Sequence, residues 1–154
     1  MTIAIVQGDI TQQETDAIVN AANTSLLAGG GVCGAIHRAA GQELEAACLE
    51  LAPCPTGSSV ITPGFRLPAR YVIHAVGPRW LDGTRGEAEL LEQCYHSIFT
   101  LMREHHLHSI AIPAISTGIY GFPLEPATEI ALRVAGEYDS PEVEIVFVCF
   151  DAGT

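Results

Sequence analysis

Short β-type runs alternate with amphipathic helical segments along this chain, and this alternation leaves few folds open. Most of the runs are nearly continuous in apolar character, which is typical of strands covered on both faces. Strands that alternate with helices predict an α/β domain of three layers. The predicted strands are Ile3–Val6, Ala17–Ala21, Ser59–Thr62, Tyr71–Val76, Ser109–Ile115 and Val143–Phe150.

Three segments between these runs have helical periodicity. Residues Glu87–His105 carry apolar side chains at three- and four-residue spacing, and Pro126–Glu137 repeats the pattern. Val32–Leu51 is predicted as one or two helices interrupted at Gly41. A chain of 154 residues is close to the size of one typical domain. We therefore expect a single domain over residues 1–154 that needs no metal or disulfide to fold.

The basic residues are few and of one kind. All seven are arginines, so the chain contains no lysine. This excludes lysine-dependent mechanisms such as the Walker phosphate loop and Schiff-base catalysis. The formal net charge of −11 argues against nucleic-acid binding, because seven scattered arginines assemble no basic patch. A small phosphorylated ligand is still compatible with this charge, since backbone N–H groups can hold phosphate.

The sequence shows no sign of membrane attachment or export. The longest apolar runs, such as Ile110–Ile115, are far shorter than the ~18 residues of a spanning helix. No positive charge precedes the apolar stretch Ile3–Val6, so it does not resemble a secretory signal. The five cysteines are odd in number and form no C-x-x-C pair, which suits a reducing cytoplasm.

The histidines give no metal signature. His105, His106 and His108 cluster at a predicted helix end, where the helix dipole favours polar or cationic side chains. No H-E-x-x-H spacing exists. His74, inside a predicted strand, is interpreted as a hydrogen-bonded core or site-wall residue. We expect neither a metal nor a cofactor.

Three consecutive glycines, Gly29, Gly30 and Gly31, follow the second predicted strand and precede a predicted helix. Glycines at such a point let the backbone approach a ligand closely, and the free N–H groups of the helix start favour an anion such as diphosphate. The G-x-G-x-x-G spacing also fits a dinucleotide fingerprint, but the motif lies well past the strand and no acid follows at the expected distance. A glycine-rich turn without a ligand is the third interpretation.

A second glycine-containing loop, residues 113–123, follows the fifth predicted strand. Ligands of open α/β sheets lie beyond the carboxyl ends of strands, so two such loops can hold a diphosphate from both sides. The pattern Ala114-x-Ser116-x-Gly118 also resembles a hydrolase nucleophile elbow. That interpretation requires a histidine after the serine, and the last histidine is His108.

Five motifs, in order along the chain, resemble those of macrodomains. The nearest branch is the MacroD type, which also includes bacterial O-acetyl-ADP-ribose deacetylases. The resemblance runs from residue 3 to about residue 151. The motifs are Gln7–Thr11, Val19–Asn23, Gly29–Gly41, His74–Pro78 and Ala114–Pro123.

This resemblance implies a three-layer α/β/α fold with a six-stranded mixed sheet and ADP-ribose in a cleft over the strand ends. By the same resemblance, Asp9 accepts a hydrogen bond from the adenine amino group and Ile10 adds a backbone contact. Phe150 lines the adenine pocket. Asn23 orients the distal ribose, and Tyr120 lies beside that ribose. The residues matching the two phosphate loops are Gly30, Gly31 and Val32, and Ser116, Thr117, Gly118, Ile119 and Tyr120.

The sequence departs from the family at Cys33, which stands where MacroD-type enzymes have the aspartate proposed to activate water. Three interpretations remain: Cys33 fills the space as a small apolar group, its thiol acts as nucleophile or base with His37 as the nearby candidate partner, or the cysteine is an introduced change. A second departure is that the chain stops at Thr154, where relatives usually add a further helix.

The function implied is hydrolysis of ADP-ribose esters, with Asn23, Cys33 and Tyr120 as candidate catalytic residues. The substrates would be mono-ADP-ribosyl groups on Asp or Glu of proteins, or O-acetyl-ADP-ribose. The alternative is a non-catalytic ADP-ribose reader that has lost its base. ADP-ribose, its esters and ADP-ribosylated proteins are the expected partners, and we expect a monomer.

Overall fold

The computed structural model describes residues 3–118 and 120–149. All six predicted strands and all predicted helical segments are confirmed, with ends that differ by a few residues. The predicted interruption at Gly41 separates two helices, and Gly41 has a φ of 95°. The elements are β1 (Ile3–Gln7), the 3-10 turn η1 (Ile10–Gln12), β2 (Ala17–Ala21), α1 (Gly31–Ala40), α2 (Gln42–Leu51), β3 (Ser59–Pro63), β4 (Tyr71–Ala75), α3 (Glu87–Glu104), β5 (Ser109–Ile112), α4 (Leu124–Tyr138) and β6 (Glu144–Cys149).

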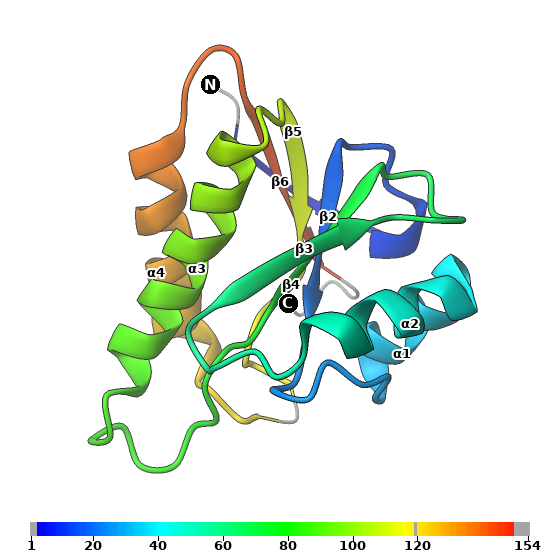
Figure 1. Ribbon diagram of the computed structural model, residues 1–154. Coiled ribbons are helices and arrows are strands. Elements are labelled where there is room, and N and C mark those ends of the chain that lie inside the picture. Colours follow the sequence, from blue (N-terminus) through cyan, green and yellow to red (C-terminus); the bar gives the residue numbers. More distant parts are fainter. Residues whose placement is uncertain (1–2, 119, 150–154) are drawn as a thin grey trace.

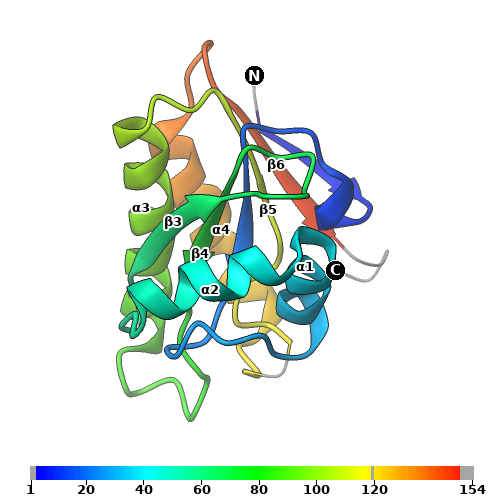
Figure 2. The same ribbon diagram turned by 45° about the vertical axis from the view of Figure 1, so that its right-hand side comes forward.

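The strands form one mixed sheet in the order β1-β6-β5-β2-β4-β3. Neighbouring strands pair in parallel except β3, which pairs with β4 in the antiparallel sense. Helices α3 and α4 cover one face of the sheet and α1 and α2 the other (Figures 1 and 2). The α/β/α architecture with a mixed sheet is thus confirmed.

Two apolar clusters hold the layers together, one on each face of the sheet. The larger includes Leu91, Ile98 and Phe99 of α3 and the smaller includes Ile36 and Leu44 of α1 and α2, all fully buried. Successive residues of β2 and β4 contribute to opposite clusters, as expected for strands covered on both faces. No helix within residues 3–118 and 120–149 is long and apolar enough to cross a membrane.

Two expectations about the strands are wrong. Strand β1 is not covered on both faces: it lies at the edge of the sheet, and Ile5 is 59 % exposed. Strand β5 ends at Ile112, not at the predicted Ile115. Pro113 follows Ile112, and proline has no N–H to donate to a neighbouring strand. The predicted last residue of β6, Phe150, lies outside the described residues.

The connections define a switch in topology at the centre of the sheet. From β2 the chain continues through α1 and α2 to strands on one side, whereas from β5 it continues through α4 to β6 on the other side. Strands β2 and β5 are neighbours and end at the same edge. In open α/β sheets, ligands bind beyond the strand ends at such a switch point. The two glycine loops follow β2 and β5 directly.

Candidate functional site

The first glycine loop, residues 22–30, leads into the N-terminus of α1. Gly30 is the N-cap, no side chain caps the helix, and the first turn contains no acidic residue. Gly31 has a φ of 58°, a conformation that favours glycine. The first N–H groups of a helix have no intrahelical partner, and the helix dipole adds a partial positive charge there. Helix α1 therefore offers N–H donors to an anion.

Helix α3 differs, because its first residue is an acid whose carboxylate binds the N–H groups of the preceding loop. Glu87 Oε2 accepts from the backbone N–H groups of Leu81, Asp82 and Gly83 at 2.9–3.1 Å, and Oε1 accepts from that of Arg85 at 2.7 Å. Burial acts to raise the pKa of Glu87, but these N–H donors outweigh it and lower the pKa to about 2. Among α1, α2, α3 and α4, α1 is the one whose first turn contains no acidic residue, which favours an external anion there.

Gly34 allows the first glycine loop to lie against α1. A Cβ on residue 34 would be 2.3 Å from the carbonyl oxygen of Gly29, far inside van der Waals contact. A glycine within a helix costs roughly 1 kcal/mol relative to alanine. Close approach of the loop backbone is the physical reason for this glycine.

The second glycine loop, residues 113–123, is closed by its own backbone. The N–H of Gly121 donates to the Gly118 carbonyl at 3.0 Å, and that of Phe122 donates to the Ser116 carbonyl at 2.8 Å. Ser116 has a φ of 67°, and its buried hydroxyl has no partner within the described part of the chain. Because no base contacts this hydroxyl, the geometry gives no support to the nucleophile-elbow interpretation.

The segment after β4 supports the second glycine loop. The Trp80 N–H donates to the Tyr120 carbonyl at 2.8 Å, and the Arg79 guanidinium lies 5.2 Å from the centre of the Tyr120 ring. A Cβ on Gly77 would lie 2.3 Å from Ser116 Oγ. Gly77 therefore lets the loop approach, and Arg79 and Trp80 hold Tyr120 from the side.

Asn23 organises the loop that follows β2. Its Oδ1 accepts from Ser25 Oγ at 2.8 Å and from the Leu27 N–H at 3.1 Å, and its Nδ2 donates to the Leu27 carbonyl at 2.9 Å. The two lone pairs of Oδ1 are thus used, while one N–H of Nδ2 remains. Asn23 can donate one further hydrogen bond, for example to a ribose hydroxyl, without breaking the loop.

Asp9 is exposed and caps η1. Its Oδ1 accepts from the N–H of Thr11 at 2.9 Å and from the Thr11 hydroxyl at 2.7 Å. Within the described residues no hydrogen bond uses Oδ2, so this oxygen can accept from a ligand. Ile10 beside it is buried in the apolar cluster under α1. Sequence reasoning did not find η1, because a single turn held by one aspartate leaves no periodic pattern.

Cys33 is buried at the start of α1, and its thiol has two polar neighbours. Sγ lies 3.5 Å from the Leu27 carbonyl oxygen and 3.7 Å from Asn20 Nδ2. His37 is buried, both its ring nitrogens lack a partner among the described residues, and burial lowers its pKa. Within this part of the chain no hydrogen bond joins His37 to Cys33. The nucleophile interpretation of Cys33 therefore has no base in contact with the thiol.

His74 is fully buried, as its interpretation as a core residue requires. Its Nδ1 contacts Asn20 Nδ2 at 3.0 Å and its Nε2 contacts Thr62 Oγ1 at 3.0 Å. Burial and the nearby His37 ring lower the pKa of His74 to about 3. The imidazole is neutral at physiological pH and structural in character.

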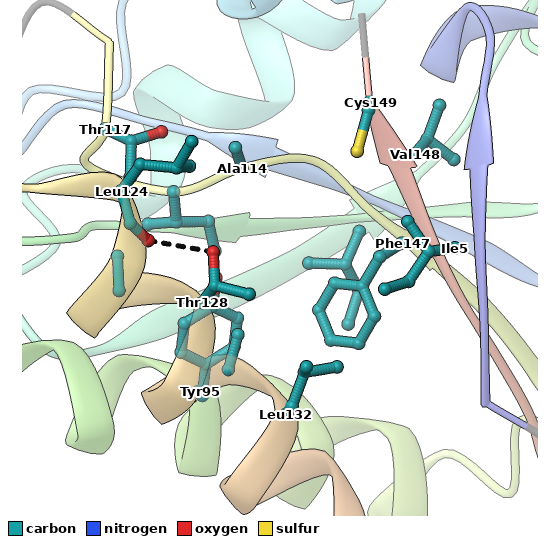
Figure 3. Close-up of a pocket in the computed structure, with 14 residues that line it drawn as sticks. Ile5, Tyr95, Ala114, Thr117, Leu124, Thr128, Leu132, Phe147, Val148 and Cys149 are labelled. Atoms are coloured by element: carbon teal, nitrogen blue, oxygen red, sulfur yellow. Dashed lines mark hydrogen bonds between the residues drawn. The ribbon is translucent and has the colours of Figure 1, made fainter. Parts of the chain in front are cut away.

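A hollow lies between α4, the strands β1, β5 and β6, and the start of the second glycine loop, where Ala114 and Thr117 line it (Figure 3). It is lined mainly by hydrocarbon side chains, including Ile5, Leu132 and Phe147, and Thr128 Oγ1 at its wall donates to the Leu124 carbonyl at 2.8 Å. Its lining includes no charged side chain. Such a surface does not suit a diphosphate, so the glycine loops define the candidate site.

The described candidate residues lie beyond one edge of the sheet, in the segments after β1, β2 and β5 and in the first turn of α1. These are Asp9, Ile10, Asn23, Gly30, Gly31, Val32, Cys33, Ser116, Thr117, Gly118 and Tyr120; Ile119 and Phe150 lie outside the described residues. Over residues 3–118 and 120–149, no group of three or more His, Cys, Asp and Glu side chains is arranged to hold a metal ion.

Comparison with known proteins agrees with this geometry. The Macro domain family matches residues 19–131. The O-acetyl-ADP-ribose deacetylase of Salmonella gallinarum is 51 % identical over 160 residues, covering 99 % of this chain and 89 % of the relative. The Oceanobacillus iheyensis macrodomain with ADP superposes with a TM-score of 0.92 at 45 % identity, covering 97 % of this chain and 83 % of that one. The Trypanosoma brucei macrodomain in complex with ADP-ribose gives 0.91 at 43 % identity, covering 99 % and 65 %. The chain belongs to the Macro domain family.

Proposed function

We propose that this protein binds ADP-ribose across the carboxyl edge of its sheet and hydrolyses ADP-ribose esters. The observation that carries the proposal is the pair of glycine loops at neighbouring strand ends, one of which leads into a helix N-terminus with no acid of its own. Neutral N–H donors from two sides suit a diphosphate. Relatives named O-acetyl-ADP-ribose deacetylase and related structures with ADP-ribose or ADP support the ligand and the reaction class.

In the proposed complex, the free carboxylate oxygen of Asp9 accepts from the adenine amino group, and Ile10 adds a contact to the same base. The two glycine loops hold the diphosphate, and the remaining N–H of Asn23 donates to the distal ribose beside Tyr120. Phe150 and Ile119 belong to the proposed site by family resemblance alone. This arrangement would hold the ester in one position, where a water molecule can reach it.

Hydrolysis requires water to reach the acetyl carbonyl of O-acetyl-ADP-ribose, or C1″ of a ribosyl group attached to Asp or Glu. In the first case water adds to the carbonyl carbon, the ester C–O bond breaks, and acetate and ADP-ribose leave. Fixed positioning of the reactants alone can lower the barrier by several kcal/mol. Cys33 has no carboxylate to activate the water. We therefore expect slow turnover that lacks the ~10²–10⁴-fold rate acceleration contributed by a general base.

A second function is favoured by one observation. The Cys33 Sγ contacts Asn20 Nδ2 and the Leu27 carbonyl, and it touches no base in the described structure. A protein with this arrangement can bind ADP-ribose without hydrolysing its esters, and would then serve as a reader of ADP-ribosylated proteins.

Measurements of ADP-ribose binding and of turnover distinguish the hydrolase from the reader. Calorimetry with ADP-ribose tests the ligand, and single-turnover assays with O-acetyl-ADP-ribose and with a protein ADP-ribosylated on Glu test the reaction. Product formation above the buffer rate supports the hydrolase. Tight ADP-ribose binding with no product supports the reader. Absence of ADP-ribose binding by folded protein rules out both.

We also infer that the protein acts as a monomer in a reducing compartment such as the cytoplasm. All five cysteines are free thiols, and four are buried. Burial raises the pKa of Cys94 to about 12, so this thiol stays protonated and unreactive. Light scattering during size exclusion checks the monomer, and a dimer mass would contradict it.

A further inference from the structure

A continuous series of polar contacts connects the interior of the sheet to Asn23. It begins at Thr62 on β3, passes through His74 on β4 and Asn20 on β2, and reaches Cys33 in α1. Cys33 then contacts the Leu27 carbonyl in the first glycine loop. The heavy-atom distances along it are 3.0 Å from Thr62 to His74, 3.0 Å from His74 to Asn20, 3.7 Å from Asn20 to Cys33 and 3.5 Å from Cys33 to Leu27.

One direction of donation is consistent with every contact of this series, and it leaves only the buried Asn20 Oδ1 without a partner among the described residues. The Thr62 hydroxyl donates to the Pro63 carbonyl at 3.1 Å, so it accepts from Nε2–H of His74. His74 Nδ1 is then unprotonated and accepts from Asn20 Nδ2. The second N–H of Asn20 points to Cys33 Sγ, which leaves the S–H of Cys33 to donate to Leu27. The thiol is a donor at this point.

Two donors meet at the Leu27 carbonyl oxygen. Asn23 Nδ2 donates to it at 2.9 Å, and Cys33 Sγ donates at 3.5 Å. The loop between them contains Leu26, which is buried and has a φ of 57°. A non-glycine residue in this conformation persists only where its surroundings hold it. The Cys33 thiol is one of the contacts that hold the loop.

We propose that Cys33 is a positioning residue for Asn23: its thiol fixes the Leu27 carbonyl, and that carbonyl fixes the amide that faces the distal ribose. This inference rests on the proposed function, because the ribose contact of Asn23 belongs to it. An ionised aspartate at residue 33 has no hydrogen to donate to Leu27, so the cysteine supplies a contact that the usual family residue cannot.

ADP and ADP-ribose distinguish this role from a general structural one, since ADP lacks the distal ribose. We expect Cys33→Ala to weaken ADP-ribose binding about threefold to fivefold, the worth of one weak S–H···O contact, and to leave ADP binding within about twofold. Cys33→Ser restores a donor and is expected to recover the native ratio of the two affinities. Cys54→Ala is the matched control, because Cys54 is also buried and lies outside the series.

Calorimetry on native protein and the three variants decides the matter. Equal weakening of both nucleotides by Cys33→Ala, no weakening of either, or no recovery in Cys33→Ser overturns the positioning role. If Cys33→Ala does not fold, Cys33→Val fills the space without a donor and is measured in its place. Folded native protein that binds neither nucleotide refutes the proposed function itself, which is a separate outcome.

Discussion

Alanine at residue 34 is expected to damage ADP-ribose binding far more than folding. The Cβ of this alanine would lie 2.3 Å from the Gly29 carbonyl oxygen, whereas real Cβ contacts are essentially never below 3.0 Å. The loop backbone must therefore retreat by at least the difference, 0.7 Å. The neighbouring atom is backbone and not the end of a flexible side chain, so the whole loop moves.

The size of the effect follows from hydrogen-bond geometry. N–H···O bonds occupy a window of only about 0.5 Å in length, so a shift of this size removes one or more phosphate contacts. Each hydrogen bond to a charged group contributes roughly 1.5–3 kcal/mol, which predicts about a tenfold to hundredfold loss of affinity for one lost bond. Overpacking costs ~1–3 kcal/mol of stability, and the gain in helix propensity from glycine to alanine offsets about 1 kcal/mol of that.

The assay is calorimetry with ADP-ribose beside thermal unfolding, for native protein, Gly34→Ala and Gly136→Ala. Gly136 lies within α4, and a Cβ there would meet no atom within 4 Å. This control should gain about 1 kcal/mol of stability from propensity and bind as the native protein does. If folded Gly34→Ala binds ADP-ribose within twofold of the native affinity, the assignment of the first glycine loop to the phosphates is refuted.

Three further outcomes are expected. Asp9→Ala should weaken ADP-ribose by ~1–3 kcal/mol in calorimetry, because the buried adenine amino group loses its acceptor; inosine-diphosphoribose, which lacks that group, should bind native protein poorly and be insensitive to the change. Gly31→Glu should abolish binding with a smaller effect on thermal stability, because its φ of 58° strains a side chain and the added carboxylate repels the diphosphate. The pKa of Glu87 is about 2 in the folded protein against 4.5 ordinarily, so its ionised form stabilises the fold above pH 4.5 and this contribution is lost as the pH falls towards 2. Urea unfolding should accordingly show lower stability of Glu87→Gln at pH 7 and a flatter decline than that of the native protein between pH 4.5 and 2.

For each of these predictions, one result would contradict it. Equal affinity of Asp9→Ala and native protein would remove Asp9 from the adenine site. Native affinity in folded Gly31→Glu would remove that glycine from the phosphate site. Parallel acid curves for native protein and Glu87→Gln would show that the N–H contacts of Glu87 contribute nothing to folding.

The elements of the fold could be predicted from the sequence because burial on both faces makes strands such as β2 and β4 nearly continuously apolar. The predictions about strands are wrong where apolar character alone does not decide the structure. Pro113 ends β5 early by lacking a donor, and β1 is apolar although it lies at an exposed edge. The turn η1 depends on one side-chain contact of Asp9 and has no periodicity to detect.

For the candidate site, local chemistry could be predicted and long-range contacts could not. Three glycines before a helix indicate an anion site from their own properties. Gly77 is required because a Cβ there would collide with Ser116 Oγ. Cys33 contacts Asn20, which in turn contacts His74. Asn20 and His74 are far apart in sequence and meet through the pairing of β2 with β4, whereas Gly77 and Ser116 follow β4 and β5, the two strands that flank β2.

The absence of charged side chains from the phosphate-facing turns has a consequence for how this protein tolerates mutation. In the proposed complex the donors are main-chain N–H groups, which every residue except proline retains. A conventional alanine scan of polar and charged side chains would therefore pass over the diphosphate contacts without disturbing them. Sensitivity should instead concentrate where an added methyl group moves the backbone, at Gly34 and Gly77. Charge reversal at surface residues other than Asp9 should be tolerated, while an added methyl group at either of these two glycines should inactivate the protein.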